Sequence, residues 1–423
     1  MIYHKTKLKN GLQLILSPLK ETKAVTVLIL LPVGSRYEAK NINGVSHFIE
    51  HLLFKGTVKR PTSLDLTKEL DAVGAEYNAF TGKDQTGYYI KLAADKIELA
   101  FDILSDMLFN SVFDAKEIDK ERGVIVEEIN MYEDNPLMYI ESLLEQLAFG
   151  NQPLAQMIAG PRAVIKTVPR AKILAYKNKF YHPNQMIVTV AGQFSRPKVL
   201  TLAHKYFGQS NSRARRVNFS PVKIKQLSPR LALKFKAIEQ VNLCLGFPAY
   251  ALGDPRLYPL YLLAVILGGN MSSRLFTNIR ERHGLAYFIN ASISTYQDIS
   301  LLGVQAGLDK KRIKPAISLI LAELQKIKKD GVTAAELKAA QEFLKGKLIL
   351  DLEDSEHVAD WLGKQQLLLN KISTPEERLK KIMAVKAPQI KKAAQEIIQP
   401  KRLNLALIGP FKDKKIFQPL LKV

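Results

Sequence analysis

The stretch YYIKLAADKIELAFDILSDMLFN, residues 88–110, places a strand directly before a helix. Its first six residues are typical of a strand, and after Asp95 the apolar side chains recur at helical spacing. A turn follows near Asn110. Asp114 and Glu117 then form the kind of pair that caps the free N–H groups at the start of a helix. The order strand, helix, turn and capped helix defines one structural unit.

The same order returns in the second half of the chain. Residues 301–308 are expected to form the strand, a helix with apolar spacing follows, and Thr333 begins the next capped helix, 219 residues after Asp114. Two matching strands that end at proline, 25–32 and 241–248, precede these units. The chain therefore contains an internal repeat, which decides the architecture.

The repeat predicts two similar α+β domains. Strands separated by helices and hairpins favour, in each domain, a largely antiparallel sheet with helices packed on one face. The segment between the two halves is polar, basic and rich in turn residues, as linkers are. We expect an N-terminal domain over residues 1–210, a linker over 211–228 and a C-terminal domain over 229–423.

Composition limits the classes of protein that fit. The 423 residues suffice for two domains, and the single cysteine, Cys244, cannot form an intrachain disulfide, which fits a reducing compartment. We find neither a signal peptide nor an apolar stretch long enough to cross a bilayer, so we expect a cytoplasmic protein without a membrane partner. The net charge of +22 attracts anions, but the basic residues are scattered and no nucleic-acid motif accompanies them. Nucleic-acid binding stays a minor alternative.

Residues 47–51 read His-Phe-Ile-Glu-His inside a segment with helical apolar spacing. At about 100° per residue, His47, Glu50 and His51 share one face of that helix. The apolar side chains occupy the opposite arc, so the helix can bury one side and present the three polar groups on the other. Imidazoles one turn apart can both reach a cation, which makes this pair a candidate zinc site.

A third ligand has to come from another segment. The helix that Asp114 begins carries Glu121 and Glu128, which are seven residues apart and lie within about 20° of one face. We predict Glu128 as the ligand, Glu121 as a carboxylate that orients a histidine, and Glu127 as a solvated or structural residue. One Zn²⁺ per chain then keeps a position for water, whose pKa zinc lowers to about 7, and Glu50 is the natural base.

The second repeat serves as an internal control. The helix aligned by its cap places Ala340 opposite Glu121 and Lys347 opposite Glu128. The packing of this type of domain therefore does not itself require the carboxylates. This difference favours a metal site over the alternative of two core histidines and a surface ion pair.

These segments resemble the zinc peptidase family of pitrilysin, insulysin and the mitochondrial processing peptidase, in its shorter two-domain branch. The resemblance covers nearly the whole chain and includes the inverzincin motif HxxEH. It implies a processing-peptidase-like metallohydrolase fold and a zinc endopeptidase that takes unfolded peptides into a closed chamber. The matching segments are residues 47–51, 78–81, 121–129, 180–186, 272–276 and 280–287.

The resemblance also implies how substrate is bound. An edge strand that pairs with the substrate backbone would be formed by Asn78, Ala79, Phe80 and Thr81. Arg280 and Tyr287 would bind the substrate carbonyl and stabilise the oxyanion. Two-domain members of the family look like dimers, and they can divide zinc binding and oxyanion binding between unlike subunits. This chain carries the residues for both roles. We therefore expect a homodimer in which Arg280 and Tyr287 of one subunit complete the zinc site of the other.

The alternative is a protein with the same fold but without peptidase activity. Some relatives resemble this chain but have lost metal ligands, and they would act as non-catalytic peptide-binding or scaffold proteins. The chain retains every predicted ligand, so we expect a metalloendopeptidase and keep the scaffold as the alternative.

Overall fold

The computed structural model describes residues 1–210, 214 and 218–422. Part of the predicted linker, namely 211–213 and 215–217, lies outside the described residues, as does Val423. The chain divides into two compact units that each combine segments from both halves of the sequence. The first unit consists of Met1–Ile129, Gln156–Ser220 and Leu348–Thr374, and the second of Asn130–Ala155, Pro221–Lys347 and Pro375–Val423.

The described part of the first unit contains a six-stranded sheet with the order β1-β2-β6-β3-β5-β4. Neighbouring strands are antiparallel except for β2 and β6, which are parallel. The strand β4 is therefore an edge strand. The bounds are β1 His4–Lys7, β2 Gln13–Pro18, β3 Ala24–Leu31, β4 Glu76–Thr81, β5 Thr86–Ala93 and β6 Ile187–Gly192.

The second unit, in the residues that the structure describes, repeats this pattern with five strands in the order β7-β11-β8-β10-β9. Again one neighbouring pair, β7 and β11, is parallel. The repeat and the largely antiparallel sheets are confirmed. The bounds are β7 Arg230–Phe235, β8 Gln240–Ala249, β9 Ala286–Thr295, β10 Ser300–Asp309 and β11 Asn404–Gly409.

Helices supply the other layers of both units, and within residues 1–210 and 218–422 none is long and apolar enough to cross a membrane. Helix α9 continues into a π-helical turn, Val265–Gly269, and a second π-helical turn spans Phe276–Arg282. The α-helices are α1 Val45–Leu53, α2 Ser63–Asp71, α3 Ile97–Asn110, α4 Ala115–Asp134, α5 Pro136–Phe149, α6 Arg162–Thr167, α7 Arg170–Phe180, α8 Arg196–Phe207, α9 Leu257–Ala264, α10 Ile313–Asp330, α11 Ala334–Asp351, α12 Ser355–Leu369, α13 Pro375–Met383 and α14 Ala387–Ile397.

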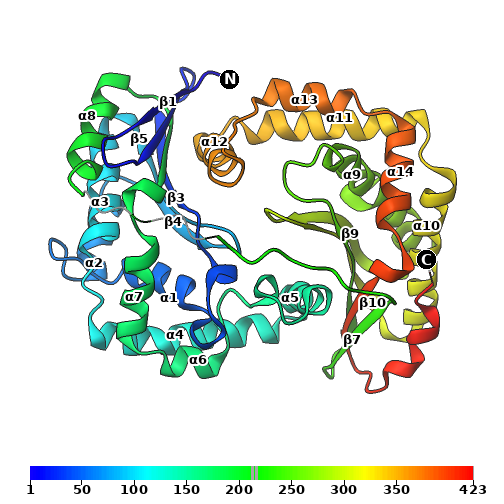
Figure 1. Ribbon diagram of the computed structural model, residues 1–423. Helices are drawn as coiled ribbons and strands as arrows, with labels where there is room; N and C mark the ends of the chain where they lie inside the picture. The colour runs from blue at the N-terminus through cyan, green and yellow to red at the C-terminus, as the bar shows by residue number, and fades with distance from the viewer. Residues whose placement is uncertain (211–213, 215–217, 423) are drawn as a thin grey trace. The chain divides into compact units, whose positions relative to one another are not determined.

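The first sheet is covered on both faces, which differs from the expected single face of helices. Along β3, Val27 and Ile29 pack into the core shared with α1, α3 and α8, whereas Leu28 and Leu30 pack against α12. Figure 1 shows α3 and α8 on one side of these strands and α12 on the other. A continuous apolar strand such as β3 is buried on both faces, and this run was the signal for a second layer.

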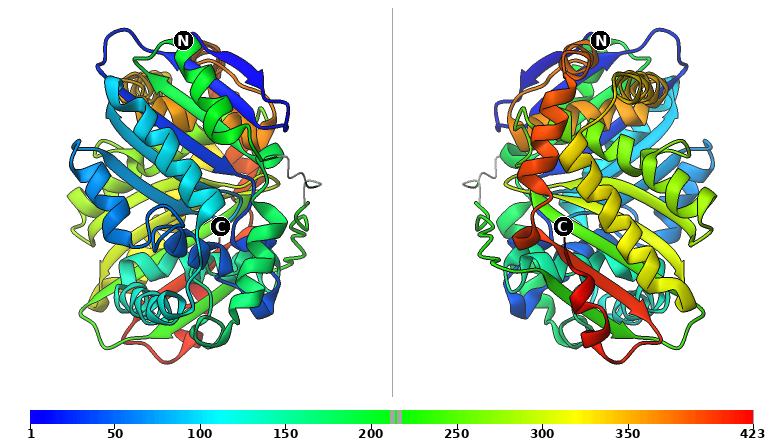
Figure 2. Two further views of the ribbon diagram at one scale, coloured as in Figure 1. Left: turned by 90° about the vertical axis from the view of Figure 1, so that its left-hand side faces the viewer. Right: turned by 90° about the vertical axis from the view of Figure 1, so that its right-hand side faces the viewer.

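The second sheet has the same arrangement. Leu243 and Leu245 of β8 face the core formed with α9, α10 and α14, while Cys244 faces α5. The helices α10 and α14 lie side by side over this sheet (Figure 2). The units therefore differ from the sequence domains 1–210 and 229–423, because α5 and α12 each pack on the sheet of the repeat to which they do not belong in sequence.

We expect Leu362→Ala to lower the free energy of unfolding by about 2–5 kcal/mol, since the side chain is fully buried between α12 and the first sheet. Leu369→Ala, at an exposed position of the same helix, should cost less than about 1 kcal/mol. Urea denaturation of the intact chain measures both. A loss for Leu362→Ala as small as that for Leu369→Ala would mean that packing of α12 does not stabilise this unit.

Candidate metal centre

The helix α1 begins at a position that only glycine tolerates. Gly44 has φ of 99°, and a Cβ there would lie 2.6 Å from the carbonyl oxygen of Ala159. The buried carboxylate of Glu38 accepts hydrogen bonds from the N–H groups of Gly44 and Ser46, both at 2.7 Å. Burial raises the pKa of Glu38, and these bonds oppose the rise. Glu38 thus caps the positive end of α1 and fixes its start.

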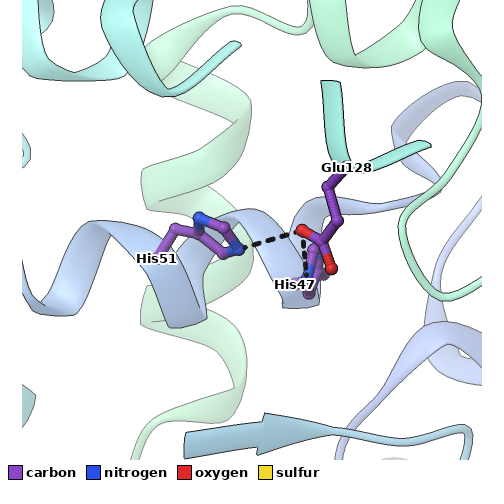
Figure 3. Close-up of side chains that lie close together, drawn as sticks. All are labelled: His47, His51 and Glu128. Carbon is purple, nitrogen blue, oxygen red and sulfur yellow. Dashed lines mark ion pairs between the residues drawn. The ribbon is translucent and has the colours of Figure 1, made fainter. Parts of the chain in front are cut away.

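Three predicted ligands come together at one point of the first unit. His47 and His51 lie one turn apart on α1, and Glu128 reaches them from α4, as Figure 3 shows. Glu128 Oε2 lies 3.4 Å from Nε2 of His47 and 3.5 Å from Nε2 of His51. The three ligand atoms lie within 4.8 Å of one another.

These separations fit a shared cation better than direct hydrogen bonds. N–H···O bonds in proteins usually measure about 2.7–3.2 Å, shorter than both distances. Tetrahedral zinc, bound at about 2.0–2.2 Å, holds its ligand atoms roughly 3.3–3.6 Å apart. Two imidazoles and one carboxylate are also the donor set of several catalytic zinc sites. The residues present therefore fit zinc.

Glu121 forms a hydrogen bond with one of the two histidines. Its Oε2 lies 3.0 Å from Nδ1 of His51, the ring nitrogen opposite to the one that faces Glu128. Its other oxygen pairs with Lys55 Nζ at 2.7 Å. A carboxylate on Nδ1 selects the tautomer whose Nε2 can bind a metal, as in other histidine zinc sites.

The carboxylates also determine the proton balance of the cluster. Burial lowers the pKa of His51, but the hydrogen bond to Glu121 and the nearby negative charge of Glu128 outweigh this effect and raise the pKa to about 9. The imidazoles of His47 and His51 hold the pKa of the Glu128 carboxyl well below its usual range. A cation that binds here therefore has to displace a proton from His51.

Glu50 lies next to His51 on α1 and faces the edge strand. The hydroxyl of Thr81 donates to Glu50 Oε2 at 2.5 Å. Glu50 and His51 line a hollow of about 300 Å³, whose other wall includes Tyr77, Asn78 and Ala79 of β4. The Glu50 carboxylate, one candidate metal ligand and the edge strand β4 thus share one surface.

Neither Glu127 nor the matching positions of the second repeat belong to this three-residue group. Glu127 is exposed and lies outside the cluster. In α11 of the second unit, Ala340 is buried and Lys347 is exposed. Among residues 1–210, 214 and 218–422, His47, His51 and Glu128 are the one group of three or more metal-ligating side chains.

The predicted oxyanion pair belongs to the second unit. The guanidinium of Arg280 lies over the ring of Phe276 at 4.7 Å. Tyr287 is 77% exposed near the start of β9, which is one of the two edge strands of the described sheet. Their part in the reaction stays a prediction.

Sequence reasoning missed three residues that shape the site. Glu38 precedes Ser46 by eight positions, beyond the spacing of any N-terminal capping motif, so no local pattern identifies it. Lys55 follows His51 by one turn, and this spacing was an available signal. Tyr77 lies on the same side of β4 as Ala79, as strand alternation predicts.

Family models match both halves of the chain. The model described as Insulinase (Peptidase family M16) matches residues 14–162, which include the metal centre. The model described as Peptidase M16 inactive domain matches residues 167–344, where the ligand positions hold other residues.

Relatives align over almost the full length. The chain is 34% identical over 402 residues to the uncharacterized zinc protease YmxG of Bacillus subtilis, covering 95% of this chain and 97% of the relative. It is 33% identical over 419 residues to an uncharacterized zinc protease of Streptomyces coelicolor, covering 97% and 90%.

Two solved structures share the fold. One is a protease from Helicobacter pylori, with a TM-score of 0.90, 24% identity and coverage of 97% of this chain and 99% of that one. The other is a peptidase M16 inactive domain from Pseudomonas fluorescens, with a TM-score of 0.90, 17% identity and the same coverage. With both halves matched by family models and relatives aligned from end to end, the chain belongs to the insulinase family, peptidase family M16.

Proposed function

We propose that this chain is a zinc-dependent endopeptidase that hydrolyses unfolded peptides, with Glu50 as the general base. The observation that carries the proposal is that the imidazoles of His47 and His51 and the carboxylate of Glu128 converge, with Glu50 outside this ligand group but next to His51 on α1. His47, His51 and Glu128 would hold the ion. When bound, zinc supplies Lewis acidity that makes water a better nucleophile at neutral pH.

Glu50 would move the proton. Its carboxylate would accept a proton from the attacking water and then deliver it to the nitrogen of the departing amine. Glu50 is not needed as a ligand, because the cluster already provides three. Its place at the hollow between α1 and β4 supports contact with a bound peptide.

The open edge of β4 supports binding of an extended substrate. Gly82, directly after β4, donates to Gln85 in the turn. Because hydrogen-bonded and non-hydrogen-bonded pairs alternate along antiparallel strands, the main chain of Ala79 faces the open edge. Its N–H donates to the side-chain oxygen of Asn78 at 2.9 Å. A peptide strand that replaced this bond would bind through its backbone, which tolerates varied sequences.

Metal analysis together with peptide cleavage tests the proposal. We expect one zinc ion per chain and cleavage of an unstructured fluorogenic peptide that a chelator abolishes and added zinc restores. A zinc-loaded protein that leaves a broad peptide library intact would favour the scaffold alternative. A chain that binds no zinc would overturn the proposal.

We further propose a homodimer in which Arg280 and Tyr287 of one subunit donate hydrogen bonds to the oxyanion formed at the zinc site of the other. Mixing a Glu50→Gln chain with a Tyr287→Phe chain should then restore part of the activity, since a mixed dimer contains one site with both groups intact. Activity is measured after mixing, with each variant alone as the control. No recovery in a mixture that forms mixed dimers would place both roles in one subunit.

A further inference from the structure

The hydroxyl of Thr81 forms a direct contact with the candidate base. Its Oγ1 donates to Glu50 Oε2 at 2.5 Å, within the range of hydrogen bonds to a charged oxygen. Thr81 is the last residue of β4, and Glu50 lies on α1. The bond therefore links the edge strand to the helix that carries the metal ligands.

Strand geometry holds the hydroxyl in this position. Side chains alternate along β4, so Thr81 points to the same side as Ala79 and Tyr77, which pack against the core that contains α1. Phe80 points to the other side and packs in the core with α12. Thr81 pairs with Thr86 of β5, and its β-branched side chain has few rotamers. The donor is thus well fixed before any substrate binds.

A fixed donor matters because a glutamate carboxylate rotates freely about its last torsion angle, which has a broad energy profile. A hydrogen bond to Oε2 restrains that rotation and leaves Oε1 available. We propose that Thr81 is a positioning residue that holds the Glu50 carboxylate in the orientation needed for proton transfer. This inference rests on the proposed function, in which Glu50 is the base.

In this arrangement β4 has two roles: its main chain can pair with a peptide, and its last side chain contacts the proposed base. The main chain of Ala79 faces the open edge, and the side chain of Thr81, two residues later, contacts Glu50. A peptide aligned on the strand would be placed relative to the base by the same rigid element. Misplacement of reacting groups by about 1 Å can cost roughly 100-fold in rate, so a modest loss of order should be measurable.

Three variants test the inference. Thr81→Val keeps the shape but removes the donor, and we expect kcat to fall roughly 10- to 100-fold while KM and zinc content stay unchanged. Thr81→Ser keeps the donor and should retain kcat within about 3-fold, because only a methyl group is lost. Thr86→Val is the matched control, since Thr86 pairs with Thr81 and its hydroxyl donates to the Val33 carbonyl, outside the site, at 2.8 Å. It should lower Tm without lowering kcat.

Comparing kcat among the three variants distinguishes a loss of positioning from a loss of stability. An unchanged kcat in Thr81→Val, or a loss that Thr81→Ser shares equally, would overturn the inference. So would a fall in kcat matched by Thr86→Val, since that would reflect damage to the hairpin.

A crystal structure of Thr81→Val tests the contact between Thr81 and Glu50 independently of any activity measurement. We expect the Glu50 carboxylate to rotate or to occupy more than one conformer, and a single conformer identical to that of the wild type would overturn the inference. If the wild type itself cleaves no peptide, the proposed function fails, and this structural comparison still decides whether Thr81 orients Glu50.

Discussion

Glu50→Gln is expected to reduce peptide hydrolysis by about 10²–10⁴-fold, the usual contribution of a general acid–base group. The amide has nearly the shape of the carboxylate and can still accept the hydrogen bond from Thr81, but it cannot take a proton from water. Glu50 lies outside the three-residue ligand group. The variant should therefore bind zinc like the wild type and unfold at the same Tm.

Steady-state kinetics with a fluorogenic peptide measure the first effect, and metal analysis with thermal unfolding measures the others. A loss confined to kcat, with zinc and Tm retained, would identify a catalytic role. Retention of more than about a tenth of the activity would assign the proton transfer to another group.

Glu128→Gln is expected to weaken zinc binding by at least about 100-fold, which is the upper range for loss of an outer partner of a ligand. In the proposed site the carboxylate charge would hold the cation between His47 and His51, and a neutral amide is a weaker zinc ligand. Activity should fall in parallel at limiting zinc. Competition with a chromophoric chelator measures the affinity.

The neighbouring glutamate provides a matched control. Glu127 lies one position earlier on α4 but is exposed and outside the cluster. Glu127→Gln makes the same chemical change and should leave zinc affinity and activity unchanged. Equal losses in both variants would mean that α4 acts through its net charge and that Glu128 is not a ligand.

Much of this site could be predicted because its geometry is local. His47, Glu50 and His51 lie within five residues of one helix, so the helical repeat alone places them on one face. The same argument put Glu121 and Glu128 on one side of α4. That these two faces meet was inferred from chemistry, since zinc needs a third ligand. The structure brings the ligand atoms of His47, His51 and Glu128 within 4.8 Å of one another.

The supporting contacts were not predictable by the same means. Glu38 reaches Ser46 through an irregular loop, and Thr81 reaches Glu50 from a strand thirty-one residues away. No spacing rule links such pairs, because loop geometry and strand register depend on the packed sheet. Glu38 nevertheless fixes the start of α1, and Thr81 contacts the Glu50 carboxylate on that helix.

The order of residues alone predicts a repeated α+β pattern, with candidate metal ligands in the first copy and none at the matching positions of the second. Periodicity and capping are short-range properties, so they are legible in a single sequence. Only the tertiary structure decided which helices complete each sheet, with α5 and α12 packing on the sheet of the repeat to which they do not belong in sequence. Burial of apolar surface is non-directional, so many helix faces could cover those strands, and complementary packing selects one.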